Sequence, residues 1–114
     1  MPRERVIELC TGLPEVVAEG EQHVGFTVRG KRFAWLLEDH HGDGRLALNC
    51  KAPAGVAAEL AGAHPERYFL PAYLGRRGWA GIWLDVPEVD WDEVERLVVE
   101  AYRMTAPKRL AASL

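Results

Sequence analysis

Residues 67–85 read RYFLPAYLGRRGWAGIWLD, a segment rich in aromatic residues with two arginines near its centre. Arg76 and Arg77 lie between two glycines, and apolar residues flank this Gly-Arg-Arg-Gly sequence on both sides. Apolar runs separated by glycine are typical of two strands and the turn between them. The segment therefore predicts strands over residues 67–70 and 78–86, joined by a turn that exposes two positive charges.

Three further strands are predicted upstream, over residues 23–29, 32–39 and 45–51. The first and third alternate apolar and polar residues, as half-buried strands do. The second has apolar residues on both faces, with Phe33, Trp35 and Leu37 together on one of them, and is therefore expected at the centre of a sheet. Because the connections between these strands are short, the strands are expected to pair antiparallel.

Helices are predicted over residues 3–11 and 53–62, where apolar residues recur at helical spacing. A third helix is expected to begin after Asp90 and to end before Pro107. Asp90 followed three residues later by Glu93 is a typical N-terminal capping pattern. Residues 15–20 are expected to form a short irregular or helical link.

These elements predict one domain over residues 1–114, with an α+β fold in the order α-β-β-β-α-β-β-α. The five strands would form one antiparallel sheet. Because each helix has one apolar stripe, the helices are expected on one face of the sheet, which makes a two-layer α/β sandwich. A chain of 114 residues has the size of one domain with one core.

Composition and cysteine use indicate the compartment. No apolar run approaches the length of roughly 18 residues that crosses a bilayer, and the N-terminus lacks the long apolar segment of a signal peptide. Cys10 and Cys50 both lie on apolar faces and are expected to be buried thiols rather than a disulfide, as in a reducing compartment. We therefore expect a cytoplasmic protein without membrane contact.

The formal net charge is −3, but the charge is unevenly distributed. Residues 29–77 carry eight basic and five acidic side chains, a local net charge of +3. The segments on either side, 1–28 and 78–114, each carry a net charge of −3. The overall charge argues against a strong nucleic-acid binder, whereas the basic middle segment allows one face to bind anions weakly.

The sequence contains no recognisable catalytic set. Ser113 is the only serine, and it lies one residue from the C-terminus. His40 and His41 are adjacent, so on a strand they would point to opposite faces, and no histidine or cysteine pair has the spacing of a metal site. We expect a protein that is not an enzyme and that has no metal ion and no cofactor.

Basic residues gather at two predicted turns. Arg29, Lys31 and Arg32 surround the first, and Arg76 and Arg77 the second. Charges at turn tips contribute to solubility and protect sheet edges. The alternative is phosphate binding, because the planar arginine fork donates several hydrogen bonds to one phosphate.

The tryptophans also allow two interpretations. Trp35, Trp79 and Trp83 are expected to pack in the core or against the sheet. Trp79 and Trp83 share one face of a predicted strand with Gly81 between them. An exposed face of this kind would suit base stacking or a protein partner.

Five motifs in this order resemble the MmcQ/YjbR family of small bacterial proteins. They are ELCTGLPEV from Glu8, GKRFAWL from Gly30, LALNCK from Leu46, PAYLGRRGWAGIWLD from Pro71 and EVERLVVEAYRMTAPKRLA from Glu93. The resemblance covers nearly the whole chain and implies a fold similar to that of secretion chaperones.

The same resemblance implies DNA binding through a double wing. The wing residues would be Arg29, Lys31 and Arg32 at the first turn and Arg76, Arg77 and Trp79 at the second. They would contact the phosphates of double-stranded DNA, weakly and without sequence preference. The alternative is a protein-interaction module or homodimer that uses a sheet face or edge and has no nucleic-acid role.

Overall fold

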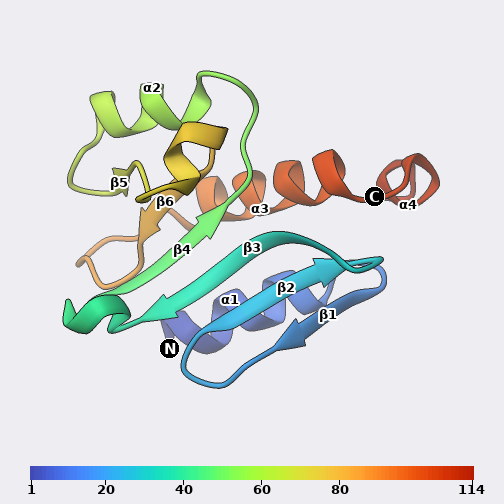
Figure 1. Cartoon of the computed structure of the whole chain (residues 1–114), viewed down its shortest axis with the longest axis horizontal. Helices are drawn as coiled ribbons and strands as arrows, with labels where there is room; N and C mark the ends of the chain where they lie inside the picture. The colour runs from blue at the N-terminus through green and yellow to red at the C-terminus, as the bar shows by residue number, and fades with distance from the viewer.

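In a computed structural model of the chain, residues 1–114 form six strands, four α-helices and two short 3-10 helices (Figure 1). The elements in chain order are α1 (Pro2–Thr11), β1 (Val16–Glu19), β2 (Val24–Val28), β3 (Lys31–Glu38), η1 (His40–Gly42), β4 (Leu46–Cys50), α2 (Val56–Ala63), β5 (Tyr68–Phe69), η2 (Leu74–Arg77), β6 (Ala80–Trp83), α3 (Trp91–Thr105) and α4 (Lys108–Ala112). None of the helices is long and apolar enough to span a bilayer.

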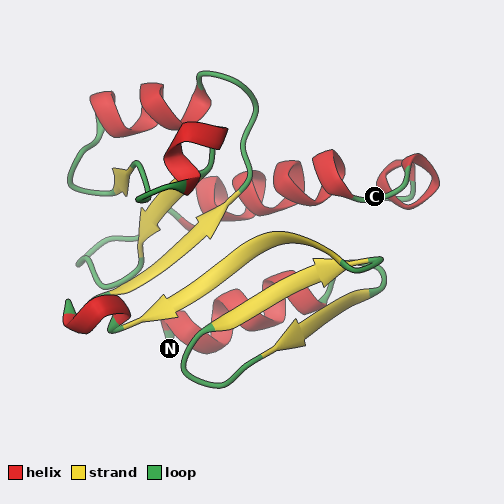
Figure 2. Cartoon of the chain, viewed as in Figure 1, coloured by secondary structure: helices red, strands yellow, loops and turns green.

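The strands form one sheet in the order β1-β2-β3-β4-β6-β5, and every neighbouring pair is antiparallel (Figure 2). The α+β class and the antiparallel pairing are confirmed, but the sheet has six strands instead of the predicted five. The additional strand is β1, within the segment 15–20 that was expected to be a link. Val17, Ala18 and Glu19 are exposed, so this edge strand has no alternating burial that would reveal it in the sequence.

The helices α1 and α3 lie behind the sheet in the view of Figure 1, and α2 lies beside the β5–β6 end. The face turned towards the viewer carries no α-helix over β2, β3 and β4. We call this surface the open face. The 3-10 helix η2, in the connection between β5 and β6, lies against part of this face.

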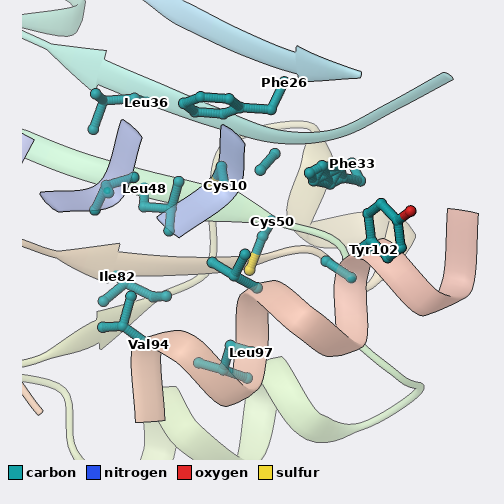
Figure 3. Close-up of a cluster of buried hydrophobic side chains, with 14 of the residues drawn as sticks. Cys10, Phe26, Phe33, Leu36, Leu48, Cys50, Ile82, Val94, Leu97 and Tyr102 are labelled. Carbon is teal, nitrogen blue, oxygen red and sulfur yellow. The ribbon is translucent and has the colours of Figure 1, made fainter. Parts of the chain in front are cut away.

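Between the sheet and the helices lies a core of 18 buried residues (Figure 3). Tyr102 on α3 packs edge to face against Phe33 on β3, with ring centroids 5.7 Å apart. Cys10 and Cys50 are both buried and unpaired, as predicted. Burial raises the pKa of Cys50 to about 12 and raises the pKa of Cys10 as well, so both thiols stay protonated and behave as small apolar groups.

A β-bulge interrupts the pairing of β2 with β3. Phe26 is opposite Ala34, whereas the next residue, Thr27, is opposite Arg32, so Phe33 is the extra residue. Phe33 and Ala34 are both fully buried. The prediction that Phe33 shares a face with Trp35 is therefore wrong, because the bulge turns Phe33 into the core and leaves Arg32 and Trp35 on the open face.

The connection from β5 to β6 also differs from the prediction. The strands are shorter than predicted, and the residues between them form a long loop containing η2 rather than a tight turn. Pro71 has no N–H to donate to a sheet ladder, and its carbonyl instead accepts a hydrogen bond from Gly75 at 2.7 Å. The start of α3 agrees with the prediction, since the Asp90 side chain accepts a hydrogen bond from the Glu93 backbone at 3.1 Å.

Tyr102→Phe is expected to destabilise the fold by about 1 kcal/mol. The Tyr102 hydroxyl donates to the Pro14 carbonyl at 2.8 Å and so connects α3 to the α1–β1 link. Removal of the hydroxyl leaves that carbonyl without this donor. Urea unfolding measures the loss, and Tyr73→Phe, at a side chain that is 86% exposed, is the control that should leave stability unchanged. Equal stability of the two variants would contradict this role for the hydroxyl.

Candidate functional site

A cleft of 580 Å³ opens at the end of the sheet, where β3 begins and β4 ends. Eight residues line it: Arg32, Trp35, Lys51, Ala52, Leu74, Arg77, Trp79 and Met104. Three of them are cations, none is acidic, and none of the three cations takes part in an ion pair. We call this site the basic cleft.

Arg32 lies flat on the open face. Its guanidinium carbon is 3.9 Å from the centre of the Trp35 ring, a cation–π contact that orients the group. Its Nε is buried and has no hydrogen-bond partner. The arginine occupies the space above Gly25, where an added Cβ would lie 2.7 Å from Nε. Arg32 is therefore held in position while its hydrogen-bonding capacity is partly unused.

The structure separates the six predicted site residues into three groups. It brings Arg32, Arg77 and Trp79 together in the basic cleft. Lys31 and Arg76 are exposed and adjacent in sequence to Arg32 and Arg77, but they do not line the cleft. The remaining residue, Arg29, lies in the turn between β2 and β3.

Arg29 is neutralised by an acidic neighbour. Its guanidinium donates two hydrogen bonds to the Glu15 carboxylate, at 2.6 and 3.1 Å. Arg29 holds the pKa of Glu15 below its usual range, and Glu15 raises the pKa of Arg29. This cation is already paired and is less available to an external anion than Arg32 or Arg77.

Lys51 belongs to the cleft but was absent from the sequence prediction. Its backbone N–H donates to the Phe33 carbonyl at 3.1 Å, which places Lys51 beside the start of β3. Antiparallel pairing of the predicted strands 32–39 and 45–51 was the available signal, because it brings the end of one strand beside the beginning of the other.

A second cavity, of 290 Å³, lies on the open face beside the basic cleft. We call it the aromatic pocket; its lining residues are His23, Trp35, Leu37, His40, His41, Asp43, Arg45, Ala47, Asn49, Phe69, Pro71, Ala72, Tyr73, Leu74 and Trp83. Trp35 and Leu74 also line the basic cleft, so the two cavities share a wall.

Trp83 lies within a layered stack on the pocket wall. The Phe69 ring lies 4.1 Å from it at an interplanar angle of 25°, and the Arg45 guanidinium carbon lies 3.7 Å from its ring centre. Arg45 also donates two hydrogen bonds to Asp85, each 2.8 Å long, which lower the pKa of Asp85. Arg45 is thus a paired, structural cation.

Asn49 lies at the floor of the aromatic pocket. Its neighbours in register are Trp35 on β3 and Gly81 on β6. The side chain is 5% exposed, and its Oδ1 has no hydrogen-bond partner. A buried amide oxygen without a partner is costly, which makes Asn49 the candidate polar contact for a ligand in the pocket.

The three tryptophans lie outside the main core and pack against the sheet, which is one of the two placements expected from the sequence. Trp79 is buried, at 6% exposure, and forms a wall of the basic cleft. Trp35 and Trp83 lie partly exposed on the open face, outside the main core. The proposed continuous Trp79–Trp83 surface does not form, because each of the two rings lines a different cavity.

Three histidines lie at the rim of the aromatic pocket. The rings of His40 and His41 are 3.9 Å apart, and those of His23 and His40 are 5.3 Å apart. The expectation of opposite orientations assumed a strand, whereas these two residues lie in η1. No group of three or more His, Cys, Asp or Glu side chains is placed to hold a metal ion.

His40 is expected to titrate below its ordinary pKa of 6.5, because burial and the nearby His41 and His23 rings disfavour its charged form. The unfolded chain then binds this proton more readily than the folded chain, so the stabilising contribution of neutral His40 is present above pH 6.5 and is lost as the pH falls. NMR titration measures the shift. His41→Ala should raise the pKa of His40, and a wild-type midpoint at or above 6.5 would contradict the assignment.

Gly81→Ala is expected to displace the Phe69 ring and weaken its stack on Trp83. An added Cβ would lie 2.4 Å from the Phe69 Cζ, and overpacking of this kind costs about 1–3 kcal/mol. Near-UV circular dichroism and urea unfolding measure both effects. Gly62→Ala is the control, because Gly62 lies in α2 with open space around it. An unchanged aromatic spectrum in Gly81→Ala would contradict the close packing.

Comparison with known proteins places the chain in a family. No match was found among curated proteins. The chain is similar to the crystal structure of the Deinococcus radiodurans protein DR2400, which contains the domain DUF419. The TM-score is 0.74 and the sequence identity is 21%, and the match covers 91% of this chain and 80% of that one. At this identity the likeness shows a shared fold. The YjbR family model matches residues 11–104, and the chain therefore belongs to the YjbR family.

Proposed function

We propose that this protein binds nucleic acid without catalysing a reaction, and that it does so through phosphate contacts in the basic cleft. The observation that supports the proposal is the convergence of Arg32, Lys51 and Arg77 on one cleft that has no acidic lining residue. Their charges are also uncompensated by ion pairs. A phosphate would supply the missing negative charge.

The geometry of the cations suits a phosphate in particular. Arginine presents a planar set of donors to phosphate oxygens, and lysine adds a compact charge. Stacking on Trp35 already orients Arg32, so less conformational entropy is lost when the anion binds. The unpaired Nε of Arg32 provides an additional donor if the side chain shifts towards the ligand.

The proposed binding is weak and independent of sequence. The chain has a net charge of −3, which opposes a polyanion at long range. The three cations in the cleft suit phosphate oxygens, which carry no sequence information. Lys31 and Arg76 are exposed and are the chain neighbours of Arg32 and Arg77, so they would add phosphate contacts on a longer duplex. The family resemblance implies phosphate contacts of this kind, through a double wing.

Lys51→Gln/Arg77→Gln is expected to weaken the binding of a duplex DNA by tenfold or more at low salt, on the order expected for the loss of two phosphate contacts. Three contacts predict a slope of log K against log salt of roughly −2.7, and the double variant should reduce its magnitude by about 1.8. Fluorescence anisotropy of a labelled duplex over a salt series measures both quantities.

Lys108→Gln/Arg109→Gln is the matched control. It removes the same two charges from exposed positions on α4, so the net charge of the two variants is identical. Wild-type affinity in the control and reduced affinity in the cleft variant would support the proposal. Equal effects in both variants would refute it, and so would the absence of binding to both duplex and single-stranded DNA by the wild type at low salt.

A further inference from the structure

We infer that the aromatic pocket binds the base of an unpaired nucleotide whose phosphate lies in the basic cleft. The inference rests on the proposed function and specifies its ligand. A nucleotide has a planar ring system joined through a sugar to an anion. The open face offers matching sites in the same order: an aromatic cavity, a shared wall formed by Trp35 and Leu74, and a cluster of three cations.

Asn49 gives the aromatic pocket a polar floor. Its Oδ1 is buried without a partner, and no other side-chain hydrogen bond satisfies the residue. A primary amide presents a donor and an acceptor side by side, the arrangement that pairs with the amino group and ring nitrogen on one edge of adenine. A base that enters the pocket with that edge first would satisfy the amide.

The walls of the pocket suit a planar ring. Across the sheet, Asn49 lies between Trp35 on one neighbouring strand and Gly81 on the other, and the Phe69 ring covers Gly81. Two strand spacings separate Trp35 from Gly81, roughly 9.5 Å between backbones. The cavity of 290 Å³ lies just below the range of ligand pockets, which span about 300–1,000 Å³. These dimensions favour one base over a larger ligand.

Tyr73 lies at the rim with a strained backbone. Its φ and ψ are 66° and −52°, and Leu74 N–H donates to the Ala72 carbonyl at 2.7 Å across it. This is a γ-turn with positive φ, a rare and strained conformation. It leaves the Tyr73 ring 86% exposed beside the pocket mouth, and strain of this kind concentrates at ligand sites. The exposed ring is placed to cover a bound base.

The pocket also distinguishes single strands from duplexes. In a duplex, each base is stacked on both faces and uses its pairing edge, so its ring is unavailable to Trp35 and Phe69. An unpaired base exposes its edges and ring faces, and base–aromatic stacking contributes to binding without requiring a particular sequence. Single-stranded DNA or RNA, or a free nucleotide, provides such a base.

Calorimetric titration of the wild-type protein with adenosine monophosphate, ribose 5-phosphate and inorganic phosphate tests the inference. We expect adenosine monophosphate to bind at least tenfold more tightly than ribose 5-phosphate, in keeping with one stacked base. A single-stranded deoxyadenosine decamer and the same decamer in a duplex form the second arm. A preference for the single strand over both the monophosphate and the duplex identifies a strand as the source. Tighter binding of the monophosphate identifies a free nucleotide.

Asn49→Leu tests the contribution of the base pocket separately from that of the phosphate site. The leucine has a similar volume and removes the unpaired amide, so the fold should be kept while the preference for adenosine monophosphate over ribose 5-phosphate is lost. Phosphate and duplex binding should remain at wild-type levels. If Asn49→Leu does not fold, Phe69→Leu at the pocket wall is the replacement variant and should give the same loss of preference.

The inference and the proposed function can fail separately. Equal affinities of the wild type for adenosine monophosphate and ribose 5-phosphate would overturn the base pocket and leave phosphate binding intact. An unchanged preference in Asn49→Leu would overturn the role of the pocket floor. Absence of binding by every phosphate-containing probe would overturn both.

Discussion

The β-bulge at Phe33 shifts the pairing of β3 with β2 by one residue. On a regular strand, Arg32 and Trp35 would point to opposite faces, since side chains alternate with a period of two. The bulge brings both to the open face, where the guanidinium stacks 3.9 Å from the indole. It also adds Phe33 to the core, where the ring meets Tyr102. The same local irregularity thus connects the helical layer to the proposed binding surface.

Ion pairing decides which basic residues are available. Arg29 donates two hydrogen bonds to the Glu15 carboxylate, and Arg45 donates two to the Asp85 carboxylate. They contribute to the structure and their charge is compensated locally. Arg32, Lys51 and Arg77 have no acidic partner and share one cleft, so an anion at that position gains the most from their combined charge. A count of basic residues in the turns does not make this distinction.

Much of the fold could be predicted from the sequence. Apolar periodicity indicated the three main helices, and the Asp90 cap located the start of α3. Alternation and short turns indicated antiparallel pairing of the central strands. The edge strand β1 escaped prediction because three of its four residues are exposed, and burial is what produces an alternating pattern. The bulge escaped because a run that is apolar on both faces has no pattern that an extra residue would interrupt.

By itself, the sequence determined the family, the α+β class and a basic middle segment that contains Arg32 and Arg77 and is followed by Trp79. These properties depend on residue type and local order along the chain. Only the tertiary structure decided that Arg29 is paired with Glu15, that Lys51 joins the basic cleft, and that Asn49 is buried without a partner in an aromatic pocket. Each of these depends on strand pairing that brings together residues separated in the sequence. Strand register and the bulge set those contacts, and neither the register nor the bulge can be predicted from residue types alone.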